Sequence, residues 1–306
     1  MSSSRPMWQG VYPAATTQFA ADSSVDLDAT QRVQTALVDD GVDGLVLLGT
    51  VGENNSLLPE EKRAVLRGAV EVLGGRVPLI TGVSELGTDR AIQYAKDAEA
   101  IGMDALMVLP AMVYVPTSEE LFAHLKAVAE ATSLPVMLYN NPPAYRVTIG
   151  FDTLEKLAAI PNVVAIKESA PDPRRITDVI NRFGDRYTIM AGLDDVALEA
   201  MLLGASGWVS GLTSAFPQES VALIAAVERG DWDEARRIYR WFMPLLHLDS
   251  DPDLVQSIKL AEQIMGRGSE RVRMPRLPLS GERRAEVTAM VEKCAATRPT
   301  LAKAAA

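Results

Sequence analysis

The segment that decides the fold reads Val163-Val164-Ala165-Ile166-Lys167-Glu168-Ser169. Its apolar residues follow one another without alternation, and a single lysine ends the run. A strand that is apolar on both sides is typical of a parallel sheet whose two faces are covered. The segment therefore predicts a buried parallel strand with Lys167 at its carboxyl end.

Similar short apolar runs recur along the chain and alternate with longer segments of helical spacing. The predicted strands are residues 11–17, 44–48, 78–82, 105–109, 135–139, 163–167, 187–191 and 207–210. The predicted helices between them include residues 59–73, 89–101, 118–131 and 194–203. This pattern predicts the α/β class and a (β/α)8 TIM barrel.

The eight strand-and-helix units use the chain as far as about Gly230. Three further helical segments follow, at residues 231–247, 253–265 and 281–295. No long Pro/Gly/Ser-rich linker separates them from the rest. We therefore expect a barrel over residues 1–230 and additional C-terminal helices over residues 231–306, packed on the barrel.

The composition limits the kinds of partner that the protein can bind. The 40 acidic residues outnumber the 30 basic residues, and the net charge of −10 repels the phosphates of nucleic acid and of anionic membranes. Cys294 is the only cysteine, so no intrachain disulfide can form. The first ten residues lack the pattern of a signal peptide. We expect a cytoplasmic protein that binds neither nucleic acid nor membrane.

Metal chemistry finds little support in the sequence. The two histidines, His124 and His247, lie far apart in helical segments. The aspartates at 194–195 and at 249–253 are interpreted as helix caps rather than metal ligands. We expect no metal and no organic cofactor, since a catalytic lysine itself supplies an electron sink.

Lys167 has two interpretations. A lysine at a strand end can leave the sheet for solvent or pair with the neighbouring Glu168. Alternatively, burial among apolar strands lowers the pKa of the amine and makes it a nucleophile near neutral pH.

Tyr139 ends the preceding predicted strand, which continues into Asn140-Asn141-Pro142-Pro143. A tyrosine at a strand end is often a packing residue. Adjacent parallel strands, however, place Tyr139 and Lys167 over the same barrel mouth, where a phenol can transfer protons.

A glycine-containing turn follows the second predicted strand and reads Gly49-Thr50-Val51-Gly52-Glu53. It matches neither a Walker loop nor a dinucleotide fingerprint. Thr50 and successive backbone N–H groups can bind a carboxylate, although a tight turn with a satisfied threonine is equally consistent with the pattern.

Together these motifs resemble the dihydrodipicolinate synthase / N-acetylneuraminate lyase family of class I aldolase-type enzymes. The matching segments are residues 49–53, Tyr139-Asn140-Asn141-Pro142 and Ile166-Lys167-Glu168-Ser169. The resemblance implies that Lys167 forms a Schiff base, Tyr139 transfers protons and Thr50 helps to bind a carboxylate. It further implies that Gly192 and Val209 line the site through their backbones, and that the chain forms a homo-oligomer, either a tetramer or a dimer.

Three positions depart from the synthases of that family. Val51 replaces a hydroxyl that relays protons from the tyrosine. Tyr114, in the stretch Leu109-Pro110-Ala111-Met112-Val113-Tyr114, is shifted in register relative to a tyrosine that reaches a neighbouring subunit. The family's carboxylate-binding arginine falls near Ala144, which leaves Arg146 as either a substrate ligand or a solvated loop charge.

A narrower likeness is to the family's 1-pyrroline-4-hydroxy-2-carboxylate deaminases. It implies that Lys167 adds to C2 of a cyclic imine carboxylate, and that loss of the 4-hydroxyl and hydrolysis give ammonia and 2-oxoglutarate semialdehyde. Substrate contacts are then expected from Asn140, Asn141, Tyr145 and Arg146.

Two other functions stay open. The first is a 4-hydroxy-tetrahydrodipicolinate (dihydrodipicolinate) synthase or another pyruvate-dependent aldolase acting on a small 2-oxo acid, which predicts the same covalent lysine. The second is a non-catalytic ligand-binding barrel, which needs neither a neutral amine nor an acid–base phenol.

Overall fold

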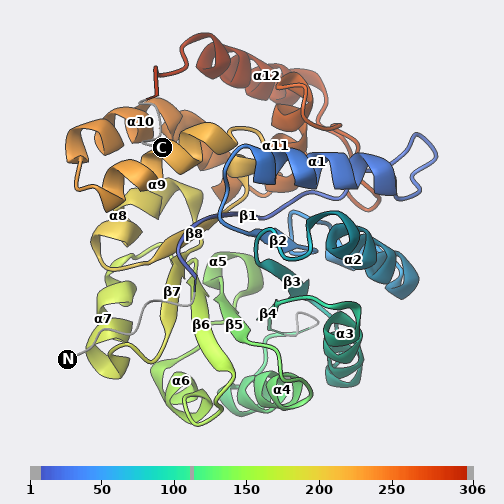
Figure 1. Cartoon of the computed structure of the whole chain (residues 1–306), viewed down its shortest axis with the longest axis vertical. Coiled ribbons are helices and arrows are strands. Elements are labelled where there is room, and N and C mark those ends of the chain that lie inside the picture. The colour runs from blue at the N-terminus through green and yellow to red at the C-terminus, as the bar shows by residue number, and fades with distance from the viewer. Residues whose placement is uncertain (1–7, 111–113, 302–306) are drawn as a thin grey trace.

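The computed structural model describes residues 8–110 and 114–301, and its centre is a barrel of eight parallel strands (Figure 1). Their order is β1-β8-β7-β6-β5-β4-β3-β2. A bridge between Ala14 and Val46 brings the two ends of this sheet together. The strands are β1 (Gly10–Pro13), β2 (Leu45–Leu47), β3 (Leu79–Val83), β4 (Ala105–Val108), β5 (Val136–Asn140), β6 (Val163–Glu168), β7 (Thr188–Ala191) and β8 (Gly207–Ser210). The predicted (β/α)8 barrel is confirmed.

Helices surround the strands in Figure 1. The helices of the barrel are α1 (Leu27–Asp39), α2 (Pro59–Leu73), α3 (Thr88–Ile101), α4 (Ser118–Glu130), α5 (Pro142–Tyr145), α6 (Phe151–Leu157), α7 (Arg174–Phe183), α8 (Ala197–Leu202) and α9 (Pro217–Glu228). Short 3-10 turns add η1 (Asn54–Ser56), η2 (Asp194–Val196) and η3 (Leu212–Ser214). The predicted bounds of α2 are confirmed: Pro59 occupies its first turn, and Glu61 accepts a hydrogen bond of 2.8 Å from the Leu58 N–H.

Two predicted elements differ from the structure. The first strand ends at Pro13 and not at Thr17, because Thr16 turns away to donate a hydrogen bond to the buried Glu262 carboxylate. The predicted helix over residues 194–203 is divided into η2 and α8. The division lets the Asp194 carboxylate turn into the protein, where it accepts hydrogen bonds from β8 and the residues after it.

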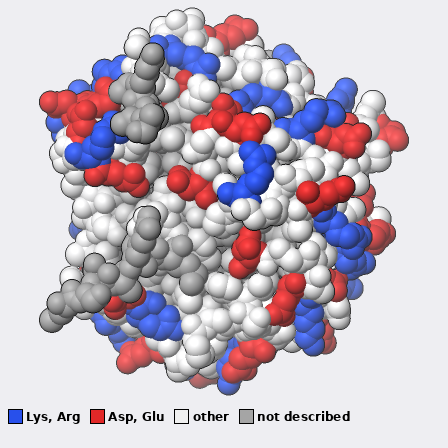
Figure 2. All heavy atoms as spheres, viewed as in Figure 1, with Lys and Arg blue, Asp and Glu red and all other residues white. Residues whose placement is uncertain are grey.

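The C-terminal helices lie along one side of the barrel, coloured orange to red in Figure 1. They are α10 (Trp232–Leu246), η4 (His247–Ser250), α11 (Leu254–Ile264) and α12 (Gly281–Ala296). The division of the chain at residue 230 stays a prediction. Within the described ranges, no helix combines the length and the apolar character needed to cross a membrane. Figure 2 shows basic and acidic side chains interspersed over the visible face.

A buried ion pair ties α11 to the glycine-containing turn after β2. Lys259 Nζ lies 2.9 Å from Glu53 Oε1 and donates a second hydrogen bond, of 2.8 Å, to the Thr17 carbonyl. Both charged side chains are fully buried. The backbone N–H of Arg273 donates to the other Glu53 oxygen at 3.0 Å. Elements far apart in sequence thus fix the position of this turn.

Replacing Lys259 by methionine is expected to lower the free energy of unfolding by about 3 kcal/mol, because Glu53 is left as a buried charge without its partner. Urea denaturation followed by circular dichroism measures the change. Lys126→Met is the matched control, since it removes a surface pair on α4 whose charged atoms are 3.8 Å apart, and we expect a loss of about 0.3 kcal/mol. Equal losses in the two variants would contradict a special role for the buried pair.

Candidate active site

Lys167 and Tyr139 lie side by side at the carboxyl ends of β6 and β5. The two residues are paired in register across the parallel strands. Lys167 Nζ lies 4.3 Å from the centroid of the Tyr139 ring. Both side chains are buried, with exposed fractions of 5% and 6%. The interpretation of Lys167 as a lysine that leaves the sheet for solvent is therefore wrong.

Glu168 points away from the amine and does not form an ion pair with it. Its carboxylate accepts hydrogen bonds from the Asn140 side chain (2.7 Å), the Ala170 N–H (2.7 Å) and the Arg175 guanidinium (2.8 Å). The expectation that Lys167 could pair with its sequence neighbour is thus also wrong, because side chains of consecutive strand residues point to opposite faces.

Burial lowers the pKa of Lys167, and the negative charge of Asp249 and, more weakly, that of Asp194 oppose this effect. A low-dielectric surrounding disfavours the charged ammonium form. A larger fraction of the amine is then neutral near neutral pH than for an exposed lysine. Only the neutral amine has the lone pair that attacks a carbonyl carbon.

Tyr139 is held with its hydroxyl on the polar turn after β5. Asn141 Nδ2 donates a hydrogen bond of 2.9 Å to the Tyr139 oxygen. The Tyr145 ring packs edge-on against Tyr139, with centroids 5.5 Å apart. Burial raises the pKa of Tyr139 to about 12. The phenol therefore keeps its proton near neutral pH and can donate it in a hydrogen bond.

The turn after β2 presents Thr50 to the same region. Thr50 Oγ1 and the Tyr145 hydroxyl form a hydrogen bond of 2.6 Å. A Cβ on Gly52 would lie 2.8 Å from the Leu48 backbone nitrogen, so the tight turn requires glycine there. Asn54 Nδ2 donates to the Leu48 and Gly82 carbonyls at 2.8 and 3.0 Å. The hydroxyl of Thr50 is thus placed by a rigid turn.

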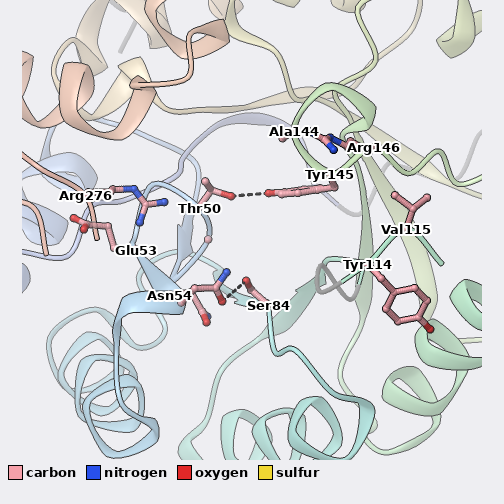
Figure 3. Close-up of a pocket in the computed structure, with 12 residues that line it drawn as sticks. Thr50, Glu53, Asn54, Ser84, Tyr114, Val115, Ala144, Tyr145, Arg146 and Arg276 are labelled. Carbon is pink, nitrogen blue, oxygen red and sulfur yellow. Dashed lines mark hydrogen bonds between the residues drawn. The ribbon is translucent and has the colours of Figure 1, made fainter. Parts of the chain in front are cut away.

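Two neighbouring cavities meet at these residues. The inner cavity, of about 40 Å³, is lined by Ala14, Gly49, Thr50, Val51, Met107, Tyr139, Asn141, Ala144, Tyr145, Lys167, Leu193, Gly211, Asp249 and Leu254. The outer cavity, of about 400 Å³, is lined by Gly49, Thr50, Glu53, Asn54, Asn55, Ser84, Tyr114, Val115, Ala144, Tyr145, Arg146 and Arg276 (Figure 3). The hydrogen-bonded Thr50 and Tyr145 belong to both, so they stand at the passage from one to the other.

The predicted site residues fall into three groups. Five of them line the inner cavity: Lys167, Tyr139, Thr50, Val51 and Asn141. Two, Tyr114 and Arg146, line the outer cavity, where both side chains are exposed. Gly192 and Val209 line neither cavity.

Gly192 nevertheless contacts the lysine, because a Cβ at this position would lie 2.9 Å from Lys167 Cγ. Val209 is fully buried in the barrel interior, in the same apolar cluster as Tyr139. The segment at 111–113, which precedes Tyr114, lies outside the described residues.

Sequence reasoning missed two charged residues of the site. Asp249, interpreted as a helix cap, lies in η4 and lines the inner cavity. Arg276 lines the outer cavity from the segment before α12. Neither residue belongs to a strand end or to a motif, so no local pattern in the sequence indicated it.

Asp194 is a buried carboxylate close to the site but is satisfied by the protein. It accepts hydrogen bonds from Trp208 Nε1 (3.0 Å), Ser210 Oγ (3.0 Å) and the Leu212 N–H (2.9 Å). Burial raises its pKa well above the usual value. Among the described residues, no group of three or more His, Cys, Asp or Glu side chains is arranged to hold a metal ion.

The arrangement combines three chemical functions. A buried amine with a lowered pKa can attack a carbonyl or imine carbon. A phenol beside it can donate a hydrogen bond to the oxygen that develops negative charge. A hydroxyl on a rigid turn can hold a carboxylate next to that carbon. The small inner cavity suits a short reactant whose remainder extends past Thr50 and Tyr145.

Comparison with known proteins gives a consistent result. The model of the dihydrodipicolinate synthetase family matches residues 7–294. The chain is 34% identical over 284 residues to 4-hydroxy-tetrahydrodipicolinate synthase 2 of Halalkalibacterium halodurans, which covers 92% of this chain and 97% of the relative.

The chain is also similar to solved structures over nearly its whole length. Dihydrodipicolinate synthase from Aquifex aeolicus is similar with a TM-score of 0.89 at 31% identity, over 94% of this chain and 98% of that one. The prophage protein YagE of E. coli K12, of the dihydrodipicolinic acid synthase family and solved in complex with pyruvate, has a TM-score of 0.88 at 27% identity, over 94% and 99% of the two chains.

Proposed function

The chain belongs to the dihydrodipicolinate synthetase family of class I aldolase-type lyases, and from this premise we propose that Lys167 forms a Schiff base with the 2-carbonyl carbon of pyruvate. The observation that carries the proposal is the buried amine of Lys167, with its lowered pKa, at the wall of a small cavity beside the Tyr139 phenol. The relative solved with pyruvate supports this choice of substrate class.

Three parts of the site take part in adduct formation. Thr50 and the adjoining backbone N–H groups bind the pyruvate carboxylate. The neutral Lys167 amine attacks C2, and Tyr139 donates a hydrogen bond to the oxygen as negative charge develops on it. The oxygen leaves as water with the two protons that the nitrogen gives up, and an imine forms. The imine converts to a nucleophilic enamine when a proton moves, through water, from C3 to the nitrogen.

For the second half of the reaction we propose condensation of the enamine with a small aldehyde that carries a carboxylate, as the names of the synthase relatives suggest. The outer cavity supplies a cation for that carboxylate. Arg276 points toward Thr50 in Figure 3, and among the described residues its guanidinium forms no ion pair. Arg146, the C-cap residue of α5, lines the same cavity.

Replacing Arg276 by alanine is expected to raise the KM for the second substrate about tenfold, because one charge-assisted hydrogen bond to its carboxylate is lost. The KM for pyruvate is expected to change by less than about twofold, because pyruvate binds in the inner cavity. Steady-state kinetics with each substrate varied in turn measures both values. Arg271→Ala is the control, since Arg271 is an exposed arginine of the same segment. An unchanged KM for the second substrate, or an equal rise for pyruvate, would contradict the assignment.

A second candidate function is the deamination of 1-pyrroline-4-hydroxy-2-carboxylate. The observation that favours it is Val51, which lines the inner cavity and has no hydroxyl to relay protons in a synthase reaction. Lys167 would attack C2 of the ring, and the 4-hydroxyl would then leave. Since the compared relatives are named as synthases, the pyruvate-dependent reaction takes first place.

Borohydride trapping tests the proposal. The protein is incubated with pyruvate or with the cyclic imine, reduced, digested and analysed by peptide mass spectrometry, while ammonia release is followed in the second reaction. A pyruvate adduct on Lys167 is the expected result. An adduct with the cyclic imine together with ammonia release would establish the deaminase instead.

Absence of a Lys167 adduct with either compound would overturn the Schiff-base proposal and return the chain to the ligand-binding alternative.

The homo-oligomeric state, as a dimer or tetramer, stays a prediction that analytical ultracentrifugation can test.

A further inference from the structure

Asp249 is the charged residue of the inner cavity that the proposed steps do not yet use. It lies in η4, and its side chain lines the cavity together with Lys167 and Tyr139. Lys167 and Asp249 form no ion pair in the described part of the chain, although the charge of each shifts the pKa of the other. The two residues therefore line the same small space without being locked in an ion pair with each other.

The position of this carboxylate is built into the fold. A Cβ on Gly211 would lie 2.5 Å from Asp249 Oδ1, so the carboxylate packs against the bare backbone that follows β8. The nearby backbone N–H of Asp194 favours its charged form. A side chain at position 211 would displace Asp249 from the cavity. The protein thus holds a carboxylate at a fixed place in an otherwise largely apolar wall.

The groups that face Asp249 are Lys167 from β6, Tyr139 from β5, and Asp194 and Asp195 from η2. Asp195 Oδ2 lies 3.1 Å from His247 Nδ1. The Asp194 carboxylate accepts hydrogen bonds from β8 and the residues after it. Among these carboxylates, Asp249 is the one that lines the inner cavity.

We propose that Asp249 is a further catalytic residue, the group that takes protons from the Lys167 nitrogen and delivers them to the departing oxygen during Schiff-base formation. The inference rests on the proposed function. Attack forms the bond between Lys167 Nζ and C2, and the carbonyl electron pair moves to the oxygen. Asp249 then carries the two protons of the nitrogen, one after the other, to that oxygen. The C–O bond breaks, water leaves, the C=N bond forms, and the Asp249 carboxylate is regenerated.

Acid–base chemistry favours Asp249 over its neighbours for this transfer. Tyr139, with a pKa of about 12, is protonated near neutral pH and cannot accept a proton from the nitrogen. Val51 offers no hydroxyl. Burial raises the pKa of Asp249 to about 6, against the opposing charge of Lys167. A group whose pKa lies near the working pH can both accept and return a proton.

The test measures the rate of adduct formation with pyruvate by borohydride quenching at timed intervals from pH 5 to 9, on the full chain. Asp249→Asn keeps the shape of the side chain, and we expect adduct formation about 100-fold slower at pH 7, the lower end of the usual contribution of acid–base groups. Asp251→Asn is the control, because Asp251 lies two residues away and pairs with Arg283 on the surface. Its rate is expected to match that of the wild type.

The pH profile separates catalysis from a structural role. In the wild type, protonation of both Lys167 and Asp249 slows the reaction at low pH, so the logarithm of the rate approaches a slope of about 2 at the acid end of this range. Asp249→Asn is expected to retain a slope of about 1. In Asp249→Ala, added acetate or formate is expected to restore part of the rate by acting in place of the missing carboxylate.

Each outcome has a distinct meaning. A wild type that forms no Lys167 adduct overturns the proposed function and this inference together. A wild type that forms the adduct, with Asp249→Asn equally fast or slowed by the same factor at every pH and with no rescue of Asp249→Ala, overturns the role of Asp249 alone. Slower adduct formation by Asp249→Asn with a slope of about 1 at low pH, together with rescue of Asp249→Ala by acetate or formate, supports the role of Asp249.

Discussion

Lys167→Ala is expected to lower kcat/KM by about 10⁵-fold and to abolish the borohydride adduct. The alanine removes the amine that attacks C2, and a nucleophile held in place is worth at least about 10⁵ M in effective concentration. Lys167→Arg is expected to be equally inactive, because a guanidinium stays protonated in proteins. Progress curves with pyruvate and a coupled assay measure the first effect, and peptide mass spectrometry measures the second.

The melting temperature of Lys167→Ala shows whether this variant still folds. The pKa of Lys167 is lowered in the folded protein, so the unfolded chain binds its proton more readily and the lysine costs folding free energy below the unfolded pKa. Lys167→Ala is therefore expected to melt close to or above the wild-type temperature. A variant that melts normally and keeps more than about 1% of the activity would contradict Schiff-base catalysis by Lys167.

Tyr139→Phe is expected to lower kcat by about 10³-fold with a change of less than about threefold in the KM for pyruvate. Phenylalanine keeps the ring beside Lys167 but removes the hydrogen-bond donor, and one such donor to a developing oxyanion contributes about 10²- to 10³-fold to kcat. The loss falls on kcat because the hydrogen bond strengthens as negative charge develops on the oxygen. Steady-state kinetics measures both constants.

Tyr187→Phe is the matched control for this prediction. Tyr187 is also buried, but its hydroxyl bonds to the Leu154 carbonyl on the outer side of the barrel. We expect it to lower stability with little effect on kcat. If Tyr139→Phe behaves like the control, the tyrosine packs beside the lysine without stabilising the charge that develops on the oxygen.

The barrel and the neighbouring positions of Tyr139 and Lys167 could be predicted from local patterns in the sequence. Strands buried on both faces are apolar without alternation, and this local pattern located all eight strands within a few residues. The spacing of Tyr139 and Lys167, one strand-and-helix unit apart, placed them on neighbouring parallel strands, and the structure pairs them in register. Both inferences depend on contacts between residues close in sequence or on adjacent strands.

Some of the residues that surround Tyr139 and Lys167 could not be predicted in this way, because distant parts of the chain supply them. Asp249 and Arg276 come from the chain after the last strand, and their positions depend on how α10, α11 and the following segment pack on the barrel. The buried bond between Lys259 and Glu53 likewise joins residues about two hundred positions apart. A short polar segment such as 247–253 has the same composition whether it caps a helix on the surface or closes a cavity. Its role is therefore set by long-range packing, which the sequence pattern does not express.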